Sequence, residues 1–162
     1  MAVTPWLAGM RMTSSRLNAI TPIYTSWTPT WSTTTGSNIP SIGNGTYNCD
    51  FTRTGNRVEA RFEVIFGSTT TFGSTDNWIW SLPVTAAATS DIAGYADVTY
   101  TSTTTRYVGR VRLFSTSTFE IDIVSGRPSG VAISNGGIID GASPETMTSG
   151  TAVRALVIYE AA

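Results

Sequence analysis

The chain has 162 residues, of which 41% are apolar and only 13% are charged, and its net charge is −1. A chain of this length and apolar content can bury a sizeable core, so we expect one globular domain. The near-neutral charge gives no electrostatic basis for binding nucleic acid or an anionic membrane surface, and no apolar run approaches the roughly 18 residues of a membrane span. We therefore expect neither a nucleic-acid partner nor membrane insertion.

Residues 1–26 differ in composition from the rest of the chain, and we predict that they form an N-terminal docking arm. The Thr13-Ser14-Ser15 segment suits the start of a short helix through Ala19, which Pro22 would end. So short a helix is not stable alone, so the arm needs a surface to cover, with a frayed terminus as the alternative. Its apolar anchors are Trp6, Leu7, Met10, Met12, Leu17 and Ile20.

Residues 27–162 are predicted to form the β-domain. The clearest signal lies in residues 57–66, where apolar and charged side chains alternate with the period of two that is typical of a half-buried strand. Thr54-Gly55-Asn56 and Ser115-Thr116-Ser117 predict tight hairpin connections. The predicted strands cover residues 46–53, 56–67, 77–83, 92–101, 106–114, 118–124 and 151–160.

These strands, their frequent turns and the lack of a long helical pattern predict an all-β fold, an antiparallel jelly-roll-like β-sandwich. Cys49 lies between Tyr47 and Phe51 in the same alternation, so we expect its thiol to be buried and unreactive. Period-two placement assigns the core to Phe62, Val64, Phe66, Trp78, Trp80, Leu82, Val111, Leu113, Phe119, Ile121 and Ile123.

Several large apolar side chains fall outside this pattern. An antiparallel sheet normally leaves one face to water, so apolar residues on that face indicate a subunit interface. The residues concerned are Ile65, Ile79, Leu156 and Ile158, from which we expect a homotrimer. The tryptophans of the N-terminal part are candidate anchors of a docking surface: Trp6, Trp27 and Trp31. Exposed aromatic rings beside Asn and Asp would also suit sugar binding.

The sequence offers little for chemistry. Because it has no histidine and a single cysteine, a Ser–His or Cys–His arrangement is excluded and a zinc site is not expected. Asp140, in a Gly-rich loop, is a weak candidate for a calcium ligand. We therefore assign no catalytic, cofactor-binding or metal-binding residue and expect no enzymatic activity. Carboxylates expected on solvated strand faces are Glu59, Glu63, Glu120 and Asp122.

Several segments along the chain together form a distinctive pattern. They are Gly43-Asn44-Gly45-Thr46-Tyr47, residues 52–58, 66–73 and 80–84, the ending 155–162, and the opening Met12-Thr13 with Leu17-Asn18. Together they resemble the small β-sandwich virion proteins of tailed actinobacteriophages, which are head-fibre, decoration or minor tail proteins. The resemblance implies a virion structural protein and carries no catalytic residues.

We therefore expect a capsid decoration or head-fibre protein that attaches through its arm to the major capsid or tail proteins of the same virion. It would act on the virion surface after assembly in the bacterial cytoplasm. The alternative is a minor tail or receptor-binding protein that contacts a host-surface glycan. A glycan-degrading enzyme is disfavoured because the sequence lacks the catalytic groups.

Overall fold

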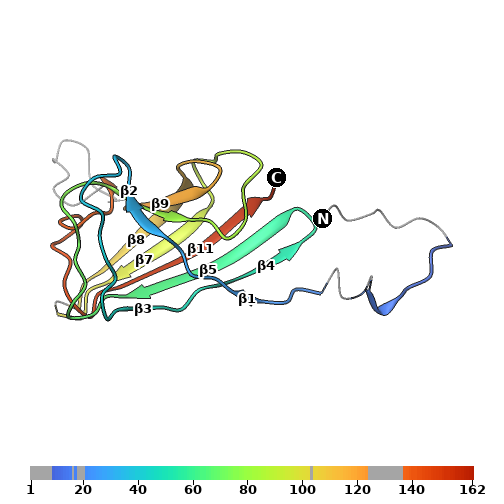
Figure 1. The fold of residues 1–162 in the computed structure, drawn as a ribbon, viewed down its shortest axis with the longest axis horizontal. Helices are drawn as coiled ribbons and strands as arrows, with labels where there is room; N and C mark the ends of the chain where they lie inside the picture. The colour runs from blue at the N-terminus through green and yellow to red at the C-terminus, as the bar shows by residue number, and fades with distance from the viewer. Residues whose placement is uncertain (1–8, 16, 18–20, 103, 124–136) are drawn as a thin grey trace.

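The computed structural model describes residues 9–15, 17, 21–102, 104–123 and 137–162. These residues form one antiparallel sheet that curls around the core, with the strand order β1-β4-β5-β11-β7-β8-β9-β6-β2 and with β3 on β5 and β10 on β9 (Figure 1). The strands are β1 (Thr25–Ser26), β2 (Trp31–Thr33), β3 (Thr46–Tyr47), β4 (Asp50–Thr54), β5 (Arg57–Ile65), β6 (Trp78–Ser81), β7 (Gly94–Thr99), β8 (Arg106–Leu113), β9 (Thr118–Ile123), β10 (Gly137–Ile138) and β11 (Ala152–Glu160).

The antiparallel all-β prediction is confirmed, and every predicted strand is present. The two separate sheets of a jelly-roll sandwich are not confirmed, because the described strands pair in one continuous order from β1 to β2. The sheet curls, so that β2, at one end of the strand order, lies over the middle of the sheet. Trp31 of β2 stacks on Phe66, which directly follows β5, with ring centroids 5.3 Å apart. One sheet therefore covers both sides of its own core.

The long strands β5 and β11 form the spine of the sheet. They pair over nine positions, from Ala152 opposite Ile65 to Glu160 opposite Arg57. Along β5 buried residues alternate with more exposed ones, as the sequence predicts. Since the two strands are in register, the outer side chains of β5 and β11 stand beside each other in rows.

A two-residue turn sets the register of the first hairpin. Gly55 adopts a φ of 63°, and Thr54 of β4 lies opposite Arg57 of β5. A glycine with positive φ at the first position of a two-residue loop is typical of the turns that match strand twist. Both β3 and β4 continue this register along β5, so the predicted strand 46–53 is correctly placed although its centre is interrupted.

The inner face of the sheet encloses an aromatic core. Phe62 contacts Trp27, Trp80 and Phe119, with ring centroids 6.3, 5.2 and 5.4 Å away. The predicted core residues are all buried except Leu82, which is partly buried. The hypothesis that Trp27 and Trp31 anchor an external docking surface is wrong, because both rings pack into this core.

Cys49 is buried as predicted, with 8% of its surface exposed. Its Sγ lies 3.4 Å from the carbonyl oxygen of Glu63. Burial disfavours the charged thiolate and raises the pKa of the thiol to about 11. Thiolate is the reactive form, so this environment favours the predicted lack of reactivity.

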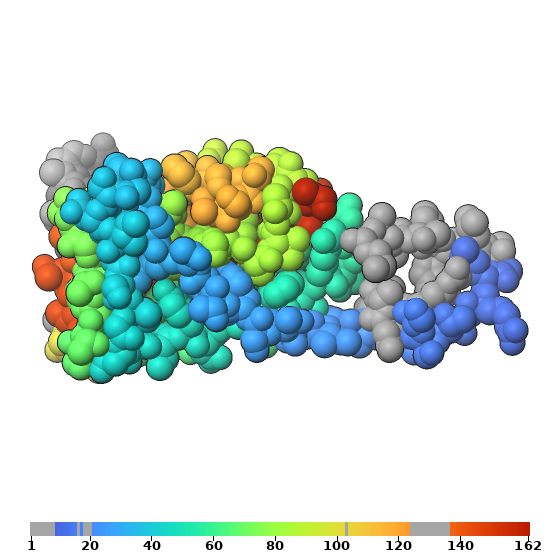
Figure 2. All heavy atoms as spheres, in the orientation of Figure 1, coloured from blue at the N-terminus to red at the C-terminus, as the bar shows by residue number. Residues whose placement is uncertain are grey.

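The described residues of the arm before β1 run away from the β-domain beyond the end of the sheet (Figures 1 and 2). Ser14, Ser15 and Leu17 have helical backbone, and the Leu17 N–H donates to the Thr13 carbonyl at 2.9 Å. Residues 16 and 18–20 lie outside the described residues, so the predicted helix through Ala19 is not confirmed. Thr25 and Ser26, counted with the arm in the sequence division, form β1 on the sheet edge.

Candidate functional site

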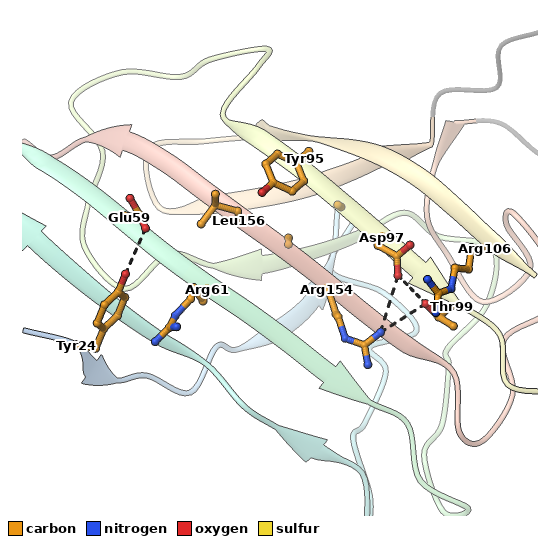
Figure 3. Close-up of a pocket in the computed structure, with 11 residues that line it drawn as sticks. Tyr24, Glu59, Arg61, Tyr95, Asp97, Thr99, Arg106, Arg154 and Leu156 are labelled. Carbon is orange, nitrogen blue, oxygen red and sulfur yellow. Dashed lines mark hydrogen bonds and ion pairs between the residues drawn. The ribbon is translucent and has the colours of Figure 1, made fainter.

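A groove of about 750 Å³ lies on the outer face of the sheet and is the candidate functional site. Its floor is formed by β5, β11 and β7, with β8 and the residue before β1 at its sides (Figure 3). The volume is in the range of small-ligand sites. Its lining residues are Tyr24, Glu59, Arg61, Tyr95, Ala96, Asp97, Thr99, Arg106, Arg154, Ala155 and Leu156.

Strand register determines which side chains meet in the groove. Leu156 of β11 lies opposite Arg61 of β5 on one side and opposite Tyr95 of β7 on the other. Arg154, two residues along β11, lies opposite Asp97 of β7. Because side chains on one face of a strand recur every second residue, these residues form two adjacent rows across the sheet.

Ion pairs hold two of the arginines in place. Arg61 donates from Nε and Nη2 to Asp50 at 2.7 and 2.6 Å, a two-pronged contact. This hydrogen bonding raises the pKa of Arg61. Arg154 lies 2.6 Å from Glu63 and 3.9 Å from Asp97. These pairs are partly exposed, so they orient side chains more than they stabilise the fold.

Two tyrosines give the groove its apolar surface. The Tyr24 ring lies under the guanidinium of Arg61, 4.0 Å from Cζ to the ring centroid, and its hydroxyl donates to Glu59 at 3.3 Å. Tyr95 is 65% exposed and stands beside Leu156. One ring is therefore engaged by an arginine, whereas the other presents an open face.

Arg106 differs from the other arginines of the groove. It is exposed at the start of β8, opposite Thr99 of β7. It forms no ion pair with the residues that the structure describes. It is therefore the cation of this site whose charge is available to a ligand.

Sequence reasoning missed Tyr24, Tyr95 and Arg106 as site residues. The alternation of Tyr95, Asp97 and Thr99 could have indicated one polar face. Tyr24 gave no signal, since its contact with Glu59 spans 35 positions of the chain.

The structure brings together only part of the predicted oligomer interface. Leu156 and Ile158 share the outer face of β11 and are partly buried. Ile65 lies on the outer face at the far end of β5 and is 37% exposed. Ile79 lies on β6, which is separated from β11 by β7, β8 and β9 in the strand order.

The predicted anchors of the arm are described only in part. Met12 and Leu17 are 70% and 47% exposed, and Met10 is half-buried. Trp6, Leu7 and Ile20 lie outside the described residues.

One of the predicted solvated carboxylates is placed differently. Glu120 of β9 is buried, with 1% exposed, and pairs with Arg112 across the sheet at 3.0 Å. Burial raises the pKa of Glu120, and Arg112 opposes that effect. The expectation of a solvated strand face was wrong here because the outward position on β9 is covered. Glu59, Glu63 and Asp122 keep part of their surface in solvent.

The candidate calcium ligand Asp140 is engaged by backbone groups. Asp140 is buried, and its Oδ1 accepts the N–H groups of Ala142 and Ser143 at 2.6 and 2.8 Å, which closes a local turn. Within the described ranges no three His, Cys, Asp or Glu side chains gather as a metal site would require.

Comparisons with protein-family models, curated proteins and solved structures found no match. Across the part of the chain that the structure describes, no helix has the length and apolar character needed to cross a membrane.

Proposed function

We propose that the chain is a non-enzymatic structural protein on the surface of a tailed bacteriophage virion, a capsid decoration or head-fibre protein. The N-terminal arm attaches it to the major capsid or tail proteins, and the β-domain projects outward. The sequence resemblance supports this assignment. We further propose that the curled sheet, whose end strand β2 packs over β5, corresponds to a jelly-roll-like sandwich.

The observation that carries the proposal is the exposure of the arm. Met12, Leu17 and Ile23 are 70%, 47% and 64% exposed on a segment that leaves the β-domain. A segment with few contacts of its own gains its ordering free energy from a partner surface. Apolar side chains held away from the chain's own core suit an attachment element.

The same protein is proposed to be a homotrimer. A threefold contact joins two different patches of the chain. Ile65 and Ile79 lie on different parts of the curled sheet, which suits such a contact. Leu156 and Ile158 form a second pair, and an interface through them would cover the outer-face groove.

A truncation that ends before the sheet tests the role of the arm. Because Tyr24 contacts Glu59 and β1 pairs with β4, residues 1–22 are removed and residues 23–162 are kept. We expect the truncated protein to keep the circular dichroism spectrum of the full chain and to lose co-sedimentation with phage particles.

A matched pair of point variants refines this test. Met12→Ser should weaken attachment, whereas Ile92→Ser, at a residue of the β-domain that is 73% exposed, should not. Undiminished attachment of the truncated protein would contradict docking through the arm. An unfolded truncated protein would show that the arm belongs to the core.

The second candidate function is a minor tail or receptor-binding protein that contacts a host-surface glycan. The groove on the outer face favours this candidate, since it combines an exposed tyrosine with charged side chains. Attachment of the chain to the tail instead of the capsid would distinguish it from a decoration protein.

A further inference from the structure

The outer-face groove has features that define a ligand class, independently of the virion assignment. Its side chains stand on the central strands of the sheet, where β5, β11 and β7 each pair with a neighbour on both sides. Backbone groups on these strands are therefore already used. A peptide cannot add to the sheet here, and recognition must use side chains alone.

The groove combines a flat aromatic ring with hydrogen-bond donors and hydrogen-bond acceptors. Tyr95 and Leu156 supply adjoining apolar surface. Asp97 and Glu59 offer acceptors, and Arg154 offers donors. Sugar rings have an apolar C–H face and a rim of hydroxyl groups that both donate and accept. An exposed aromatic ring beside fixed polar groups complements such a ligand.

The polar groups are held in place before a ligand arrives. The Thr99 hydroxyl donates to Asp97 at 2.6 Å, and Arg154 is held between Asp97 and Glu63 (Figure 3). Side chains that are already oriented lose less conformational entropy on binding. The groove is thus arranged for a ligand with a defined pattern of hydroxyl groups.

The charged side chains of the groove limit the class of ligand further. The lining holds three arginines and two carboxylates, and Asp50 and Glu63 beside the groove pair with two of those arginines. Arg61 and Arg154 have carboxylate partners, whereas Arg106 has none among the described residues. One available guanidinium at the edge of the groove matches one ligand carboxylate. A polyphosphate would need several free cations.

A second copy of the chain related by a twofold axis fits this face poorly. Across the sheet the outer side chains form the row Asp50, Arg61, Leu156, Tyr95, Arg110 and Asp122. The row has the same order of charges from either end. A twofold axis through its centre, along the row or along the strands, would set like charges over one another.

We propose that the groove binds a carbohydrate that carries a carboxylate group. A sugar ring stacks on Tyr95 beside Leu156, and hydroxyl groups of the carbohydrate bond to Asp97 and Arg154. Arg106 lies opposite Thr99, four residues along the sheet from Tyr95 or about 13 Å, so it pairs with a carboxylate carried by another part of the carbohydrate.

The test titrates the full-length protein with acidic and neutral sugars and follows binding by nuclear magnetic resonance. The acidic probes are 3′-sialyllactose and a galacturonic acid trisaccharide. The neutral counterparts are lactose and the methyl ester of the galacturonic acid trisaccharide. We expect at least one acidic probe to bind about tenfold more tightly than its neutral counterpart, the effect of one charged contact.

Three variants locate the site. Arg106→Gln should remove the preference for the acidic form, and Tyr95→Ala should weaken binding of both forms about tenfold or more. Arg11→Gln makes the same charge change at an exposed residue of the arm and should bind like the parent protein. Both groove positions are exposed, so the variants should fold, which circular dichroism checks.

Several outcomes would overturn the proposal. They are failure of every acidic probe to bind at millimolar concentration, equal binding of acidic and neutral forms, or unchanged binding in Tyr95→Ala and Arg106→Gln. Self-association that protects Tyr95 and is lost in Tyr95→Ala would instead identify a second copy of the chain as the occupant. None of these results depends on whether the protein attaches to a virion.

Discussion

At the scale of single residues, burial decides the behaviour of the polar and aromatic side chains. Phe62 and Glu120 are both almost fully buried. Burial of the Phe62 ring stabilises the core, whereas the cost of burying the Glu120 carboxylate is offset by its ion pair with Arg112. Tyr159 is buried, its hydroxyl donates to the Val84 carbonyl at 2.8 Å, and burial raises its pKa to about 12. The protonation of these side chains and their effect on stability therefore depend more on local environment than on residue type.

The aromatic core predicts a large effect for Phe62→Ala. This ring contacts three other aromatic rings, and its loss leaves a cavity, so the free energy of unfolding should fall by roughly 3–5 kcal/mol. Urea unfolding measures the change. Phe114→Ala, at a ring that is 46% exposed, is the control and should cost less than about 1 kcal/mol. An equal loss of unfolding free energy in Phe62→Ala and Phe114→Ala would show that Phe62 is not a core residue.

Glu120 predicts a specific pH dependence. Burial raises the pKa of its carboxyl in the folded state above the ordinary value of 4.5. The folded state then binds this proton more tightly than the unfolded chain, so the contribution of Glu120 to stability decreases as pH rises through the folded pKa. Relative to Glu120→Gln, the wild-type protein should lose stability as the pH rises above the ordinary carboxyl pKa of 4.5. A relative gain over that range would contradict the burial effect.

At the scale of elements, close approach of two backbones fixes the position of β7 against β11. Gly94 has a φ of 156°, and a Cβ built on it would lie 1.8 Å from the Leu156 carbonyl oxygen. Only glycine fits between these strands at this point. The groove depends on this contact, because β7 carries Tyr95 directly after it.

Gly94→Ala should therefore disturb the pairing of β7 with β11. We expect a loss of unfolding free energy of more than about 3 kcal/mol, because backbone and not a flexible side chain must move. Gly36→Ala is the matched control. That residue also has a positive φ, 73°, but no atom lies within 4 Å of its added Cβ, so only about 1 kcal/mol of backbone strain is expected. A Gly94→Ala protein as stable as this control would contradict the close approach.

The strands could be predicted from the sequence because a period of two is a local signal. The alternation along residues 57–66 places both the core and the outer face of β5 correctly. The curl of the sheet could not be predicted, because it depends on the pairing of β6 with β9 and β2. The groove was not predicted for the same reason, since its residues come from strands that meet only through long-range register.

At the scale of the whole molecule, the proposed trimer and the proposed groove make competing demands on one face. An interface through Leu156 would close the groove. One through Ile65 would lie beside the end of the groove that Thr99 and Arg106 line, because these residues share one row of the sheet. The arm adds a third surface, outside the β-domain.

Sedimentation tests how the subunits associate. The wild-type protein should be a trimer at micromolar concentration, and Ile79→Glu should convert it to a monomer, because a charge on a buried interface is costly. Leu156→Glu should leave the trimer intact. A wild-type monomer would contradict the trimer, and dissociation caused by Leu156→Glu would place the interface over the groove.

The central claim is that the chain is a surface component of a phage particle, held by its arm. Cryo-electron microscopy of intact particles, compared with particles that lack the gene for this chain, tests it most directly. We expect additional density outside the capsid that fits the curled β-domain, joined to the shell by residues of the arm. Identical maps from the two kinds of particle, with the chain absent from purified virions, would contradict the account.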